Sequence, residues 1–142
     1  MKGRVLQVGL LITVASLLVV SGCAREDRSP LAGTEWVLEE YGEPGNLISA
    51  LPDHTPTISF DDDTEVTGFT GCNWYGGTYT AAADGTLEFG MMHQTEIACL
   101  EPGVMEQETD FMNALRLAQG YEHVNAQLHI SGDGQLLVFS GS

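Results

Sequence analysis

The residues of this chain with the clearest chemical potential are two cysteines and the asparagine beside one of them. Cys72 and Asn73 lie in a tract rich in glycine and aromatic residues, 68–77, and Cys99 ends the segment 95–99. If Cys23 at the amino end is acylated, these two thiols are an even pair in an oxidising compartment, where pairing is the default. We predict a disulfide between them, although spacing alone leaves the distance between the sulfurs open.

The remaining residues of the tract 68–77 are interpreted as structural. Glycines at this density favour close approach of two backbones or positive φ angles over ordinary strand. Asn73 is suited to hydrogen-bond the backbone around Thr95, as asparagine does in turns. The tract is therefore expected to organise the fold and not to form an active loop.

Sequence patterns for catalysis are missing from this chain. No serine lies in a Gly-x-Ser-x-Gly elbow, there is no His-Glu-x-x-His, and no glycine loop precedes a lysine. Twenty acidic residues in this length make pairs of carboxylates unavoidable, so such pairs do not indicate acid/base catalysis. We expect no catalytic residues and no cofactor, and an envelope hydrolase is the least favoured class of function.

Two groups of residues invite a metal interpretation. The acidic turn 61–65 offers carboxylates for calcium, but Val66 and Cys72 stand where a calcium loop needs glycine and glutamate. Met91 and His93, with Cys99, are soft ligands suited to copper(I), yet methionines near strands and helices are more typical of core packing. We predict a solvated turn, core methionines and no metal site.

The amino end has the pattern of a bacterial lipoprotein signal. A basic head is followed by an apolar run, two small residues and Cys23, in that order. The run is shorter than the roughly 20 apolar residues of a membrane-spanning helix. Residues 1–22 are therefore predicted to be a signal peptide, and Cys23 the lipid-attachment site that anchors the protein without spanning the membrane.

Cleavage before Cys23 would leave a strongly acidic protein. All twenty acidic residues follow Cys23, while the remaining basic residues are Arg25, Arg28 and Arg116, a formal charge of −17. Such a field repels nucleic acid and bare anionic lipid, so nucleic acid is excluded as a partner. The predicted location is the bacterial cell envelope, with the protein facing the periplasm or the extracellular side.

The mature chain has room for one domain. Residues 23–32 read as a charged, flexible tether that carries the lipid, and residues 33–142 as a single domain. Alternating or turn-bounded apolar residues predict strands. The expected strands are 33–41, 57–60, 65–70, 77–80, 86–89, 123–130 and 135–139, and residues 91–95 are expected to form either another strand or an irregular crossing.

A single helix is expected over residues 102–118, because apolar residues recur there at helical spacing. Arg116 near its end and Gly120 beyond it match the preferences of a helix carboxyl terminus. Residues 42–56 are predicted to be a long loop. Strands followed by one helix and a hairpin favour an α+β domain, with a curved, mostly antiparallel sheet that forms a partly closed barrel, and one packed helix.

The tract 68–77 also resembles the META domain family of HslJ-like bacterial proteins, and the resemblance spans about residues 33–140. Its most specific part is Gly-Cys-Asn paired with Thr-x-x-Ala-Cys, whereas the other matching positions are generic core spacing. Glu96 and Ile97 fill the gap where family members commonly carry a basic residue and methionine. The residues matching the family motif are Gly68, Gly71, Cys72, Asn73, Thr95 and Cys99.

The resemblance implies a small antiparallel sheet or cracked barrel with one helix, often lipid-anchored, and a link to heat shock and stress. It establishes no reaction. The leading hypothesis is a non-enzymatic, lipid-anchored envelope protein that acts in stress response or envelope integrity through contacts with a protein partner. The alternative is a binding module that holds a lipid tail or hydrophobic peptide in a partly open barrel lined by residues such as Phe60, Phe89 and Leu128.

Overall fold

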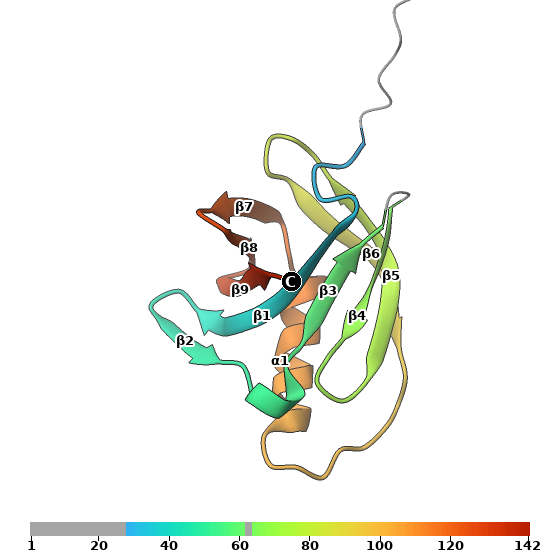
Figure 1. Ribbon diagram of the computed structural model, residues 1–142, viewed down its shortest axis with the longest axis vertical. Coiled ribbons are helices and arrows are strands. Elements are labelled where there is room, and N and C mark those ends of the chain that lie inside the picture. Colours follow the sequence, from blue (N-terminus) through green and yellow to red (C-terminus); the bar gives the residue numbers. More distant parts are fainter. Residues whose placement is uncertain (1–27, 62–63) are drawn as a thin grey trace, which may run out of the picture.

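The computed structural model describes residues 28–61 and 64–142 of the chain (Figure 1). The bounds of the elements are β1 (Thr34–Glu43), β2 (Asn46–Ser49), η1 (Pro52–His54), β3 (Thr57–Phe60), β4 (Glu65–Phe69), β5 (Trp74–Ala81), β6 (Leu87–Gln94), α1 (Val104–Arg116), β7 (Gly120–Val124), β8 (Gln127–Gly132) and β9 (Gln135–Gly141). The expected signal peptide and Cys23 lie outside the described residues, as do Asp62 and Asp63 of the acidic turn.

All these strands join one antiparallel sheet in the order β6-β5-β4-β3-β1-β9-β8-β7, with β2 paired to the second half of β1. The first strand therefore lies in the middle of the sheet. It pairs with β3 along one edge and with β9 along the other. A register shift between Leu38 and Glu40 marks a bulge, which bends β1 and increases its twist.

The sheet curls until its two outermost strands approach each other. Thr86, just before β6, forms a bridge with Gly120 at the start of β7, and the main-chain N–H of Tyr121 donates to the carbonyl of Gly85 at 2.8 Å. Helix α1 packs inside the curl against β6, β8 and β9 (Figure 1). The expectation of an α+β fold with a curved antiparallel sheet and one packed helix is confirmed.

The core fills the space between the sheet and α1. Phe111 and Leu115 project from the helix and are fully buried, and the ring of Phe111 lies 5.8 Å from that of Tyr75 and 6.3 Å from that of Phe139. Further buried residues from the strands are Leu38, Ile58, Phe60, Val66, Tyr79, Leu87, Leu128, Ile130 and Leu137. Strand alternation and helical periodicity thus supply the two surfaces of one core.

The packed part of the chain begins before β1. Leu31 is fully buried in the core, although the sequence places it in the tether. The carbonyl of Leu31 accepts a 2.6 Å hydrogen bond from the hydroxyl of Thr34, and the N–H of Gly33 donates to Phe60. The residues just ahead of β1 are therefore fixed to the fold.

Two predicted elements differ from the structure. Residues 123–130 form the hairpin of β7 and β8, not one strand, because Asn125 takes the left-handed conformation (φ 57°). Apolar alternation continues across this turn and hides it. The expected loop 42–56 also contains β2 and η1. The helix is confirmed over Val104–Arg116, and its first residue follows Gly103 at φ 85°.

Candidate functional site

The candidate site is built on the turn that joins β4 to β5, where the Gly-Cys-Asn motif lies. The N–H of Thr70 donates to the carbonyl of Asn73 at 2.8 Å, and the N–H of Asn73 donates to the hydroxyl of Thr70 at 2.8 Å. Gly71 occupies φ 101°, a conformation that favours glycine. Thr70, Cys72 and Asn73 are all buried, so the turn points into the protein.

Both motif glycines lie where a side chain would collide with neighbouring backbone. A Cβ at Gly68 would lie 2.2 Å from the carbonyl oxygen of Thr57 and 2.5 Å from the hydroxyl of Tyr75. That hydroxyl donates a 2.8 Å hydrogen bond to the same carbonyl, and burial raises the pKa of Tyr75 well above its ordinary value. A Cβ at Gly71 would lie 2.4 Å from the carbonyl oxygen of His54.

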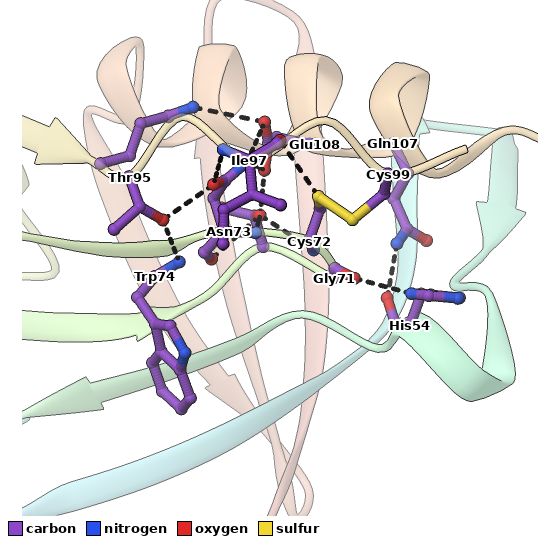
Figure 2. The surroundings of a disulfide bond; sticks show 12 residues. His54, Gly71, Cys72, Asn73, Trp74, Thr95, Ile97, Cys99, Gln107 and Glu108 are labelled. Atoms are coloured by element: carbon purple, nitrogen blue, oxygen red, sulfur yellow. Dashed lines mark hydrogen bonds between the residues drawn. A yellow bond between two sulfur atoms is a disulfide. The ribbon is translucent and has the colours of Figure 1, made fainter. Parts of the chain in front are cut away.

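The side-chain amide of Asn73 holds the segment that precedes the helix. Its Oδ1 accepts hydrogen bonds from the N–H of Ile97 at 2.7 Å and from the hydroxyl of Thr95 at 2.8 Å. Its Nδ2 donates to the carbonyl of Ile97 at 3.0 Å. One amide therefore binds both main-chain groups of Ile97, as a neighbouring strand would (Figure 2).

A disulfide joins Cys72 to Cys99 beside this amide (Figure 2). Their Cα atoms are 6.0 Å apart, within the ordinary range for bonded cysteines. The sulfur of Cys72 lies 3.3 Å from the carbonyl oxygen of Ile97. This is a close contact and not a hydrogen bond, because a disulfide sulfur carries no proton. The segment 95–99 is thus fixed at both ends, covalently at Cys99 and by hydrogen bonds at Thr95.

Sequence reasoning missed the most deeply engaged acidic residue, Glu108. It lies on α1, is 4% exposed, and accepts hydrogen bonds from the hydroxyl of Thr70 and from the amides of Asn73 (2.9 and 3.1 Å) and Gln94 (3.3 Å). The available signal was its place on the apolar face of the helix. A carboxylate at a core position needs partners, and those come from the motif turn.

Gln107, also missed, links the helix to the segment before β3. It is fully buried, its Oε1 accepts from the N–H of Leu51 at 2.8 Å, and its Nε2 donates to the carbonyl of His54 at 2.7 Å. The imidazole Nδ1–H of His54 in turn donates to the carbonyl of Gly71 at 2.8 Å, since a carbonyl only accepts. Glu108 therefore binds the motif turn directly, and the adjacent Gln107 binds it through His54.

The arrangement is a bracing network in which buried polar side chains are joined by hydrogen bonds and a disulfide. Among the described residues, no buried side-chain nitrogen or oxygen lacks a hydrogen-bond partner. The sulfur of Cys99 is bonded to Cys72 and is unavailable as a thiolate ligand for a soft metal. Across residues 28–61 and 64–142, no three histidine, cysteine, aspartate or glutamate side chains are grouped as metal ligands.

The network presents an exposed segment at the surface. Ile97 is 56% exposed and Leu100 is 93% exposed, although the chain around them is tied down. We call residues 95–101 the presented loop.

None of the helices in the described part of the chain has the length and apolar character needed to cross a membrane.

Comparison with known structures supports the fold. An NMR structure of a protein from Burkholderia xenovorans is 28% identical, with a TM-score of 0.66, over 79% of this chain and 83% of that one. A crystal structure of a DUF4847 family protein from Bacteroides vulgatus ATCC 8482 shares the fold at 16% identity, with a TM-score of 0.60, over 78% of this chain and 94% of that one. Among curated proteins, none is similar enough to this chain to match it.

The family assignment rests on the whole folded part of the chain. The profile of the META domain matches residues 29–142, which include Leu31 as well as the turn, the presented loop and α1. The META family is not known as a family of enzymes. The chain therefore belongs to the META domain family.

Proposed function

We propose that this META domain protein is a non-enzymatic, lipid-anchored protein of the bacterial envelope that acts through contacts with a protein partner in stress response or envelope integrity. The observation that carries the proposal is the use of the motif. Its polar side chains hold the presented loop, and the carboxylate of Glu108, which lines a hollow of about 330 Å³ beside α1, is held by hydrogen bonds from the motif turn and from Gln94. A motif used in this way supports presentation of a surface, not turnover of a substrate.

The presented loop has the properties of a contact surface. Leu100 and Ile97 offer apolar side chains to solvent, and the loop that carries them is already ordered by Asn73 and the disulfide. A partner would therefore pay little conformational entropy to bind it. Exposed apolar residues on a fixed loop are suited to fill a pocket on another protein.

Charge indicates the kind of partner. Glu96 and Glu101, the chain neighbours of Ile97 and Leu100, are exposed, within a chain of formal charge −15. Complementary potentials favour a partner whose apolar pocket is rimmed by lysine or arginine. The same field disfavours insertion of the loop into anionic lipid.

A filled core favours this hypothesis over the hydrophobic-ligand alternative. Phe60 is 1% exposed and Leu128 is 0% exposed, so both side chains are buried in the core. The ring of Phe89 stacks on that of Phe60, with 6.3 Å between their centroids. A lipid tail would have to displace these side chains from the core.

The contact is tested by cross-linking in cells. A photoreactive amino acid placed at Leu100, before α1, should give a defined cross-linked product. The same group at Leu117, which follows α1 and is 45% exposed, should not. Leu100→Asp should leave the thermal midpoint unchanged and abolish co-purification of the cross-linked protein. Equal cross-linking from both positions would contradict a specific contact at the presented loop.

The anchor is tested separately. Detergent phase partitioning should place the wild-type protein in the detergent phase and Cys23→Ser in the aqueous phase, because one residue carries the acyl groups. Mass spectrometry of the mature amino terminus identifies the modification directly. A mature chain that begins elsewhere than residue 23, or that lacks acyl mass, would remove the anchor from the proposal while leaving the presented loop unaffected.

A further inference from the structure

The face of the sheet opposite α1 carries a second arrangement of side chains that the presented loop does not use. Ile58, Phe60 and Val66 point into the core and are buried, so their neighbours Ser59 and Thr67 point outward, on strands β3 and β4. We call this surface the outer face. It is formed by β1, β3, β4, β5 and β6.

An apolar row crosses the outer face. Strand register places Val37 opposite Thr57, Thr57 opposite Phe69, and Phe69 opposite Trp74. Trp74 is 64% exposed, and its ring lies 5.2 Å from that of Phe69. Figure 2 shows its indole pointing away from the bracing network, which fixes its main chain through Thr95.

A polar row runs beside the apolar row and is displaced from it by two residues on each strand. Register places Glu35 opposite Ser59, Ser59 opposite Thr67, Thr67 opposite Gly76, and Gly76 opposite His93. Four strand spacings separate the ends of this row, about 19 Å. In the part of the chain that the structure describes, the hydroxyls of Ser59 and Thr67 have no hydrogen-bond partner, which leaves them open to a ligand.

Two hollows lie along these rows and share Thr67. One, of about 290 Å³, is lined by residues that include Val37, Thr57, Ser59 and Trp74. The other, of about 360 Å³, is lined by residues that include Gly76 and His93. The two hollows are adjacent across the strands, with Thr67 between them, and together we call them the outer groove.

Gly76 leaves room for the ring of His93 against the sheet in the second hollow. A Cβ at this position would lie 3.1 Å from two atoms of the His93 ring, so the imidazole lies directly over the glycine. A larger residue would push the ring away and fill the groove. Within the tract 68–77, Gly76 therefore shapes the outer face, whereas Gly71 is required by the motif turn.

We propose that the outer groove binds a short neutral oligosaccharide. An exposed indole offers an apolar plane to the C–H faces of a sugar ring, and the adjacent hydroxyl, carboxylate and imidazole groups match the many donors and acceptors of its hydroxyls. No lysine or arginine lines either hollow, and the chain is strongly acidic, which disfavours sulfated, phosphorylated or uronic-acid sugars.

The proposal does not rest on the lipid anchor or on the presented loop. An extended peptide is the competing occupant of a surface of this size. The hydroxyls and the flat indole favour the sugar, because the hollow beside Trp74 lies over β1, β3, β4 and β5, interior strands that offer no free edge to a peptide backbone.

The test is a titration of the full mature protein followed by two-dimensional NMR. The probes are chitotriose, cellotriose and maltotriose, each to about 10 mM, which reveals dissociation constants in the millimolar range. At least one should shift amide signals of β1, β3, β4 and β5 at the two rows. A response to chitotriose alone points to an N-acetylated glycan such as that of a cell wall, and a response to the glucose trimers points to a glucan.

Variants assign the binding to Trp74. Trp74→Ala should weaken binding at least tenfold, Trp74→Phe should retain part of it, and Ile48→Ala, a matched exposed apolar residue on β2, should leave it unchanged. The NMR spectrum of each free variant reports whether it is folded. No shift with any of the three sugars, shifts elsewhere on the protein, or shifts caused only by a neutral extended decapeptide would each overturn the proposal.

Discussion

The side-chain nitrogen of Asn73 lies 2.9 and 3.1 Å from the two carboxylate oxygens of Glu108, so a turn between two strands is bound to the middle of the only long helix described. The Asn73 amide and the Glu108 carboxylate satisfy each other's hydrogen-bonding groups. The carboxylate is buried and needs donors, and the amide, which also binds Ile97, has a second hydrogen to donate. The family motif is therefore completed by a helix residue outside it.

Replacement of Asn73 by alanine should lower the free energy of unfolding by about 3 kcal/mol. The change leaves the N–H of Ile97 without its acceptor and removes donors from a buried carboxylate, and unsatisfied buried groups are costly. Urea denaturation measures the loss. Asn113→Ala, at an exposed position of the same helix, is the control and should change stability by less than about 0.5 kcal/mol.

Gly71→Ala and Gly134→Ala separate backbone strain from collision. Both glycines have positive φ, 101° and 75°, but a Cβ at Gly71 would lie 2.4 Å from the carbonyl oxygen of His54, whereas nothing lies within 4 Å of one at Gly134. We expect a loss of about 1 kcal/mol at Gly134 and clearly more at Gly71. If both variants lost the same stability in thermal or urea denaturation, the backbone would be able to move away from the new Cβ at position 71 without a measurable loss of stability.

Removal of the disulfide should lower stability by about 3.6 kcal/mol in the chain-entropy estimate for a loop of this length. The double variant Cys72→Ala with Cys99→Ala should unfold at the same urea concentration with and without reductant, whereas the wild type should lose stability in reductant. Alkylation without reductant, followed by mass spectrometry, provides the control. Labelling of both cysteines in the native wild-type protein would contradict the bond.

Stability should fall above pH 10 partly because of Tyr75. Burial raises the pKa of Tyr75 well above its ordinary value of 10.0, so the unfolded chain loses this proton first and gains stability as pH rises. The free energy of unfolding is unaffected by this group below pH 10, and its decline above that reaches at most about 1.4 kcal/mol per pH unit.

Tyr75→Phe isolates that contribution, since the pKa values of Tyr41 and Tyr121 are also raised, each chiefly by burial. The variant should be less stable at neutral pH by about 1 kcal/mol, because it loses the hydrogen bond to Thr57. Its stability should then fall less steeply between pH 10 and 11. Parallel pH profiles for the two proteins would exclude Tyr75 as a source of the decline.

Local patterns predicted much of the fold. The helical spacing of Phe111 and Leu115 located α1, because a helix that packs on a sheet needs one apolar face. The hairpin at Asn125 escaped prediction because alternation continues across the turn while the chain reverses direction. Periodicity predicts which residues are buried, and a two-residue turn barely changes the alternation of apolar and polar residues, so it does not reveal the turn.

The candidate site was harder to predict because its partners are far apart in the chain. Asn73 was expected to bind near Thr95, and the hydrogen bonds to Thr95 and Ile97 agree with that expectation. Glu108 and Gln107 carry no motif of their own, and their roles follow from the docking of α1 against the turn. The outer groove likewise depends on strand register, which single-sequence patterns do not specify.

The place of β1 in the centre of the sheet has a consequence for how the domain folds. Trp36, near the start of the folded chain, pairs with Gly141, at its end, so the seam between the two parts of the sheet closes only when the last strand is available. A nascent chain therefore keeps one edge of β1 unpaired until β9 has been synthesised. Such long-range pairing slows folding, and a factor that shields that edge would protect the chain while it waits.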